Sequence, residues 1–248
     1  MAYEHLIFRL SGIIVGLALA LFSYSIMKAT KGASKGWLYF TIAGFFFFMF
    51  TVTSSLFTVL DITIARIISH ILFIPGTIVL VASFAQLTED FNIRKPSWLS
   101  PRNIVIANIG IIIVLFLFYL AYTDMAILPM LLTVVIFDAM LVNFLGIFST
   151  YYLWRGTSRK IWLSLLAFTL LFMLGQLSAI YSGQCCSEVA PFTAEPACAD
   201  YILDYVRIFP VPCNTMGVAF ADIGYNALTL GGLLLVANFF YLWRKLAH

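Results

Sequence analysis

Five polar residues inside apolar segments are the side chains of this chain best placed to bind a ligand: His70, Gln176, Asp222, Tyr225 and Asn226. A polar group in the hydrocarbon core of a bilayer is costly, so it usually faces other helices. A helix rises about 1.5 Å per residue. This rise places His70, Gln176 and Asp222 about 10–14 Å below the outer ends of their segments. We expect a small-ligand or ion pocket that opens outward. Interhelical hydrogen bonds that merely hold the bundle together are the alternative.

Other polar residues inside the apolar segments suggest charge pairing within the bundle. Arg66 and His70 are four residues apart and share one helix face. Both are candidate partners for Asp222, since an isolated carboxylate at that depth is costly. Asp138 lies near the middle of its segment, and Asn143 lies further inward. These groups would serve an ion pathway, or a paired and purely structural network.

All four cysteines fall between the last two apolar segments, in a stretch expected to be a loop over about residues 184–213: Cys185, Cys186, Cys198 and Cys213. An even number of cysteines on an oxidising face predicts two disulfides. A bond between adjacent cysteines is strained, so each of the first two is expected to pair with one of the last two. The alternative is a metal or redox site, but there is no C-x-x-C spacing and no histidine nearby.

The elements that position these residues are membrane-spanning helices. The 248 residues are 62% hydrophobic and 10% charged, whereas soluble domains are about 25% charged. A membrane helix needs about 20 apolar residues, and the sequence offers seven such runs. We therefore predict an all-α integral membrane protein, with residues 1–248 forming one seven-transmembrane-helix bundle. The runs are Leu6–Met27, Trp37–Leu60, Ile62–Leu87, Asn103–Tyr122, Ala126–Trp154, Ile161–Gly183 and Thr215–Trp243.

The basic residues predict the orientation. Cytoplasmic loops are rich in Lys and Arg, and alternate connections of this chain hold eleven of its fourteen basic residues. The N-terminus is therefore predicted outside and the C-terminus in the cytoplasm, in the cell membrane. The eleven are Lys28, Lys31, Lys35, Arg94, Lys95, Arg102, Arg155, Arg159, Lys160, Arg244 and Lys245.

Small residues recur at a spacing of four on the first and last segments. Gly12, Gly16 and Ala20 share one face, as do Gly217 and Ala221. This spacing lets helix backbones approach closely. We expect packing within the chain, and a face between copies in a homo-oligomer is the alternative.

Seven segments with an outer N-terminus resemble, in topology, microbial rhodopsins and the seven-helix sensor modules of some histidine kinases. A retinal protein needs a Schiff-base lysine inside the last segment, where this chain has Asp222 and Asn226, so we exclude that linkage. A bis-histidine haem is not expected either, because His5 and His70 lie at different depths. No cofactor or metal is predicted, and no family is assigned. The lysines, none of them inside a segment, are Lys28, Lys31, Lys35, Lys95, Lys160 and Lys245.

No hydrolase or phosphate-loop motif is present, and the intracellular connections are short. We expect a protein without catalytic activity of its own that acts as a subunit of a membrane complex or as a sensor through a partner. Its partners would be the bilayer and other membrane subunits, not nucleic acid. A transporter or ion pathway that uses the intramembrane Asp, His and Asn residues is the first alternative, and a membrane redox subunit is the second.

Overall fold

The computed structural model describes residues 2–60, 63–122, 127–157, 160–189 and 216–247, and within these ranges every long element is a helix. Seven α-helices and one short 3-10 helix, η1, account for the described residues outside turns. Their bounds are α1 (Ala2–Ala29), α2 (Lys35–Leu60), α3 (Thr63–Asp90), η1 (Ser97–Leu99), α4 (Pro101–Tyr122), α5 (Ile127–Thr157), α6 (Lys160–Val189) and α8 (Met216–Ala247).

Four stretches of these helices are long and apolar enough to cross a membrane: Leu10–Ala29, Lys35–Leu56, Ile71–Asp90 and Pro101–Phe118. Their outward side chains are apolar as well. On α4, for example, Val114 is 65% exposed and Leu117 is 58% exposed. A continuous apolar surface of this kind suits lipid and not water. The chain is therefore a helical integral membrane protein.

The helices coincide with the seven apolar runs, with two informative differences. Two separate helices are confirmed for the runs Trp37–Leu60 and Ile62–Leu87, because α2 packs along α3. Helix α6 runs six residues beyond the predicted Gly183, to Val189. Nothing in the sequence between the two positions breaks a helix.

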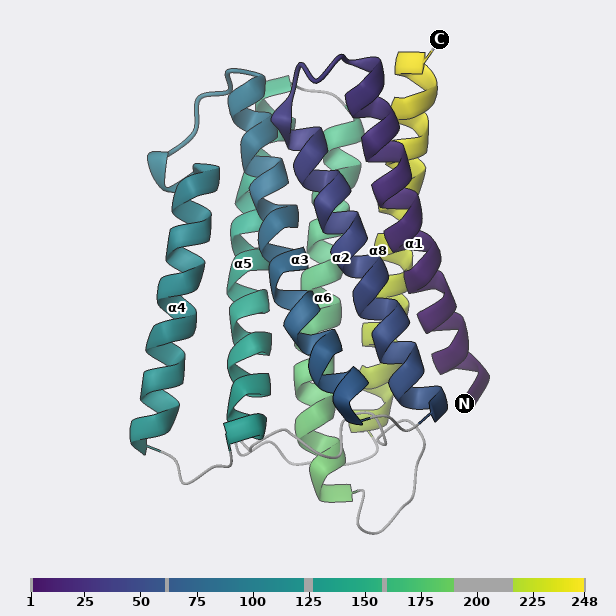
Figure 1. Ribbon diagram of the computed structural model, residues 1–248, viewed down its shortest axis with the longest axis vertical. Coiled ribbons are helices and arrows are strands. Elements are labelled where there is room, and N and C mark those ends of the chain that lie inside the picture. The colour runs from purple at the N-terminus through teal and green to yellow at the C-terminus, as the bar shows by residue number, and fades with distance from the viewer. Residues whose placement is uncertain (1, 61–62, 123–126, 158–159, 190–215, 248) are drawn as a thin grey trace.

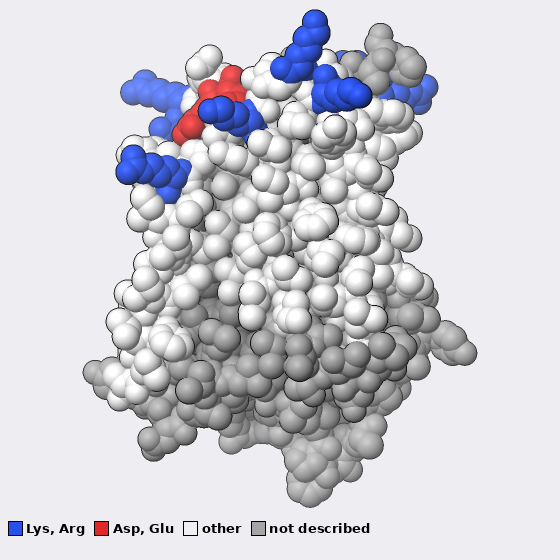
Figure 2. Space-filling model, in the orientation of Figure 1, with Lys and Arg blue, Asp and Glu red and all other residues white. Residues whose placement is uncertain are grey.

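The helices run alternately up and down (Figure 1), and their packing forms a closed ring. Going around it, α1 packs on α2, α2 on α3, α3 on α5, α5 on α6, α6 on α8, and α8 returns to α1. Helix α4 stands outside the ring against α3 and α5. The described basic residues gather at one end of the bundle, together with the described acidic residues (Figure 2). These acidic residues are Glu89 and Asp90. This end carries the α1–α2 and α3–α4 connections and the end of α8.

Aromatic rings fill the core toward the charged end. Phe40 of α2 is fully buried and lies edge-on to Phe84 of α3, with ring centroids 5.0 Å apart. It also lies edge-on to Phe239 of α8 at 4.9 Å. Edge-to-face pairs of this kind contribute about 0.5–1.5 kcal/mol each beyond the area they bury. One ring thus joins three helices.

Glycines allow α1 and α2 to touch along their backbones. A Cβ on Gly16 would lie 2.5 Å from the backbone nitrogen of Phe48, and one on Gly44 would lie 2.5 Å from that of Ala20. A Cβ on Gly12 would lie 2.6 Å from the Thr51 side chain. The predicted small-residue face of α1 therefore packs against α2 of the same chain. The Gly217 and Ala221 side of α8 lies outside the residues whose side chains the structure describes.

Hydroxyl groups inside the bundle are satisfied by their own helices. Ser23 donates to the Leu19 carbonyl at 2.6 Å, Thr77 to that of Phe73 at 2.8 Å, and Ser83 to that of Val79 at 2.6 Å. In a medium without water, an unsatisfied polar group costs several kcal/mol. This bonding lets Ser and Thr occupy apolar helices without a partner on a neighbouring helix.

Replacing Gly16 by Ala should destabilise the bundle. The new methyl has no room beside the α2 backbone, so the two helices must separate, at a cost of about 1–3 kcal/mol for overpacking. We expect a lower melting temperature in detergent.

Gly110→Ala is the matched control, because a Cβ there meets nothing within 4 Å. Its effect should be neutral or stabilising, by up to about 1 kcal/mol of helix propensity. Equal destabilisation by both changes would contradict the close contact between α1 and α2.

Candidate functional site

The helices that carry the predicted outer pocket meet inside the bundle. Helix α6 packs along α8, and Phe73 of α3 contacts Phe172 of α6 with ring centroids 6.4 Å apart. Of the five pocket residues, Asn226 on α8 is exposed. The side chains of the other four lie outside the described residues, so the pocket stays a prediction. Those four are His70 on α3, Gln176 on α6, and Asp222 and Tyr225 on α8.

One of the predicted mid-membrane polar residues holds two helices together. Asn143 of α5 is 1% exposed, and its Nδ2 donates to the Thr169 carbonyl of α6 at 3.4 Å. The hydroxyl of the same Thr169 lies 3.1 Å from that of Thr150 on α5. This contact matches the structural alternative for Asn143. The side chains of Arg66 on α3 and Asp138 on α5 lie outside the described residues.

The cysteine stretch begins on a helix. Because α6 reaches Val189, Cys185 and Cys186 belong to its last turns and not to the predicted loop. Their side chains, and all of Cys198 and Cys213, lie outside the described residues. The two disulfides therefore stay a prediction.

At the charged end of the bundle, the described residues form a second candidate site. It begins where α3 ends, at Asp90. Asn92 has a positive φ of 52°, a conformation that Asn tolerates better than most residues. The Ile93 amide donates to the Thr88 carbonyl at 2.8 Å, and the Asn92 amide donates to that of Glu89 at 2.8 Å. This pair of bonds is a Schellman motif. It turns the chain sharply back across the end of the helix.

Because Gly156 has no side chain, the segment that follows α3 can pack directly on α5. A Cβ on Gly156 would lie only 2.7 Å from the Ile93 side chain. Ile93 therefore occupies the place that a larger residue at 156 would take, and it packs against the main apolar core. Phe91 contacts Trp162 of α6 with ring centroids 5.8 Å apart. Two apolar contacts thus fix the segment on both α5 and α6.

Lys95 ties the same segment to α3 and to η1. Its Nζ donates to the Ala85 carbonyl at 2.7 Å and to the Leu99 carbonyl at 2.8 Å. It also pairs with Glu89 Oε1 at 3.3 Å, and its side chain is only 8% exposed. Burial lowers the pKa of Lys95, because the ammonium loses hydration, and the opposing effect of Glu89 offsets this only in part. Lys95 is thus a structural cation.

Asp90 joins the end of α3 to the start of α2. Its Oδ2 accepts from the Ser34 hydroxyl and from the Gly36 amide at 3.3 Å, and its Oδ1 accepts from Gln86 Nε2 at 2.9 Å. The first amides of a helix lack partners within the helix and carry partial positive charge. The carboxylate therefore caps α2 from a neighbouring helix.

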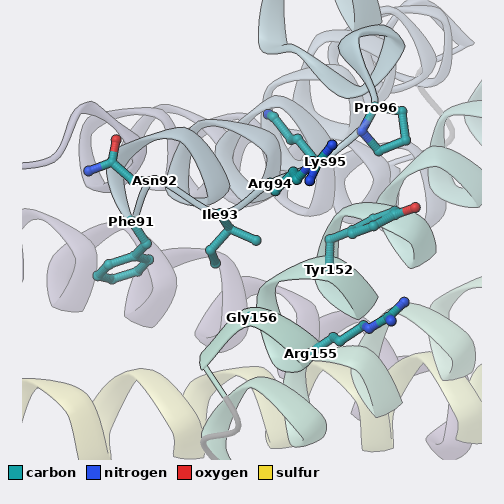
Figure 3. A pocket seen from close by; sticks show the side chains of 9 residues that line it. All are labelled: Phe91, Asn92, Ile93, Arg94, Lys95, Pro96, Tyr152, Arg155 and Gly156. Carbon is teal, nitrogen blue, oxygen red and sulfur yellow. The ribbon is translucent and has the colours of Figure 1, made fainter.

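A hollow of about 720 Å³ lies between this segment and the end of α5. Residues 91–96 form one wall, and Tyr152, Arg155 and Gly156 form the other. Arg94 and Lys95 lie on the segment side, whereas the Tyr152 ring and the Arg155 guanidinium extend from α5 (Figure 3). The hollow therefore offers two guanidinium groups and a phenol, which suits binding of an acceptor group.

In the sequence, Arg94, Lys95 and Arg155 indicate only the side of the membrane on which their connections lie. A usable signal was the run Glu89-Asp90 followed within six residues by Arg94-Lys95-Pro96. Acidic and basic residues on either side of a helix end favour local pairing. The approach of Arg155 could not be read from the sequence, because it depends on how α3 and α5 pack.

Comparison with protein-family models, with curated proteins and with solved structures found no match for this chain.

Replacing Lys95 by Met should destabilise the protein and alter its pH dependence. Losing hydrogen bonds to two carbonyls should cost about 1–3 kcal/mol near neutral pH. Between the lowered pKa and the ordinary value for lysine, the unfolded chain binds more protons than the folded one. The wild-type free energy of unfolding should therefore rise with pH in that window.

The variant lacks this rise, so the wild-type advantage should widen from neutral pH toward pH 10. Unfolding in detergent over this range is the measurement, and Lys245→Met, at an exposed position on α8, is the control. Parallel pH profiles for wild type and Lys95→Met would exclude a buried ammonium.

Proposed function

We propose that this chain is a multi-pass protein of the cell membrane, with its N-terminus outside, that acts without catalysis as a subunit of a membrane complex or as a sensor through a partner. The observation that carries the proposal is the gathering of the described basic residues at one end of an apolar bundle (Figure 2). A basic end is the feature expected of the cytoplasmic side. The predicted outer pocket, with His70 and Asp222, would then face the other side.

The packing supports a scaffold role. The described core joins helices through aromatic rings such as Phe40, whereas the hydroxyls of Ser23 and Ser83 bond within their own helices. Ser164 Oγ donates to Asn238 Oδ1 at 2.6 Å, which links α6 to α8 by a neutral contact. Contacts of this kind hold the helices in a fixed arrangement.

Lysine labelling tests the orientation on the unmodified chain. All six lysines fall on the predicted cytoplasmic side. A membrane-impermeant amine reagent applied to intact cells should therefore modify none of them, and permeabilisation should expose those that are not buried. The measurement is mass analysis of the labelled peptides.

An Asp124→Lys variant supplies the control, because position 124 lies in a predicted outer connection. Its new lysine should react in intact cells. Labelling of Lys31 or Lys160 from outside would reverse the proposed orientation.

Purification tests the subunit role. Extraction from the native membrane in mild detergent should give a particle larger than the 27.8 kDa chain, with a second polypeptide in fixed stoichiometry. Size measurement by light scattering combined with mass spectrometry distinguishes this from a homo-oligomer. A monomer that transports an ion in liposomes would favour the transporter alternative, and an absorbing cofactor would favour the redox alternative.

A further inference from the structure

The hollow at the charged end carries positive charge that the described residues do not neutralise. Arg94 and Arg155 are both exposed, and within the described part of the chain neither makes an ion pair. The two carboxylates described at this end of the bundle are already engaged. Glu89 pairs with Lys95, and Asp90 caps α2 and accepts from Gln86. Two guanidinium groups from different elements therefore remain available at one hollow.

The wall that carries Arg94 is fixed before any ligand arrives. The Schellman motif at Asn92, the Ile93 contact with Gly156 and the hydrogen bonds of Lys95 each restrain it. A rigid site loses less conformational entropy on binding. The volume of about 720 Å³ also lies within the roughly 300–1,000 Å³ usual for small-molecule sites.

Aromatic side chains place the hollow at the level of the membrane surface. Trp98 of η1 is 47% exposed and lies edge-on to Phe148 of α5. Tyr151 and Trp154, in contact with each other, flank Tyr152 and Arg155 on α5. Exposed Trp and Tyr favour the headgroup region. The phosphate groups of lipids lie in this layer.

We propose that the hollow binds a phosphate group of an anionic ligand, with Arg94 and Arg155 as the charged donors and the Tyr152 hydroxyl as a neutral donor. A guanidinium presents parallel N–H groups that match two phosphate oxygens. An anionic phospholipid headgroup and free phosphate share this chemistry. The inference does not depend on whether the chain is a complex subunit.

Binding to the full chain in dodecyl maltoside, a detergent without phosphate, tests the inference. The probes are short-chain phosphatidylglycerol, short-chain phosphatidylcholine and inorganic phosphate. Calorimetry measures the binding of each. The test variant combines Arg94→Gln with Arg155→Gln. Since both side chains are exposed, the variant should keep the wild-type melting temperature.

The wild type should bind phosphatidylglycerol more tightly than phosphatidylcholine. The double variant should lose about tenfold in affinity for phosphatidylglycerol, a conservative figure for losing hydrogen bonds from charged donors. The matched control combines Arg244→Gln with Lys245→Gln, which removes the same charge from exposed positions at the end of α8. It should bind as the wild type does.

The probes also distinguish the two sources of phosphate. Binding of inorganic phosphate that the test variant loses would identify free phosphate as a sufficient ligand, whereas binding of the lipid alone would identify the headgroup. Unchanged binding in the test variant, equal losses in both variants, or no binding of any anion would overturn the proposal.

Discussion

The contact of Phe40 with Phe84 and Phe239 is the interaction on which the rest of the bundle depends. It joins α2, α3 and α8 within one fully buried group. Lipid tails are as apolar as leucine, so helices in a membrane gain little from the hydrophobic effect and associate by close packing. The glycine contacts between α1 and α2 follow the same rule. Where backbones touch, dispersion forces replace the driving force that water supplies to soluble proteins.

The helices could be predicted because each one must satisfy its own backbone in lipid. Apolar length alone therefore located α1 to α5 to within a few residues, and Asp61 marked the break between α2 and α3. The end of α6 was missed because the sequence around Gly183 becomes more polar before it stops being helical. The partner of the small-residue face of α1 could not be deduced, since spacing shows that Gly16 permits close approach but not which helix approaches.

The charged end was less predictable, because its geometry arises from contacts between distant residues. Lys95 looks like any exposed loop lysine in sequence, yet it is buried against the carbonyls of Ala85 and Leu99. Arg94 and Arg155 line one hollow although they are far apart in sequence, where Ile93 fits over Gly156 at the end of α5. Asn92 was a readable cue for a turn, but the direction of that turn depends on how α3 packs against α5. For the outer pocket, the sequence predicted the helix that carries Asn226 but not the direction in which its side chain faces.

The closed ring of helices has a consequence for biosynthesis. Helix α8 follows all the other described helices in sequence, yet it packs against both α1 and α6, and Gly232 lies directly against Val15. While the chain is still being inserted, the Phe40 ring has Phe84 beside it but lipid in the place of Phe239. Docking of α8 then exchanges disordered acyl chains for a fixed ring contact. Among the described helices, the one synthesised last is therefore the one that closes the ring.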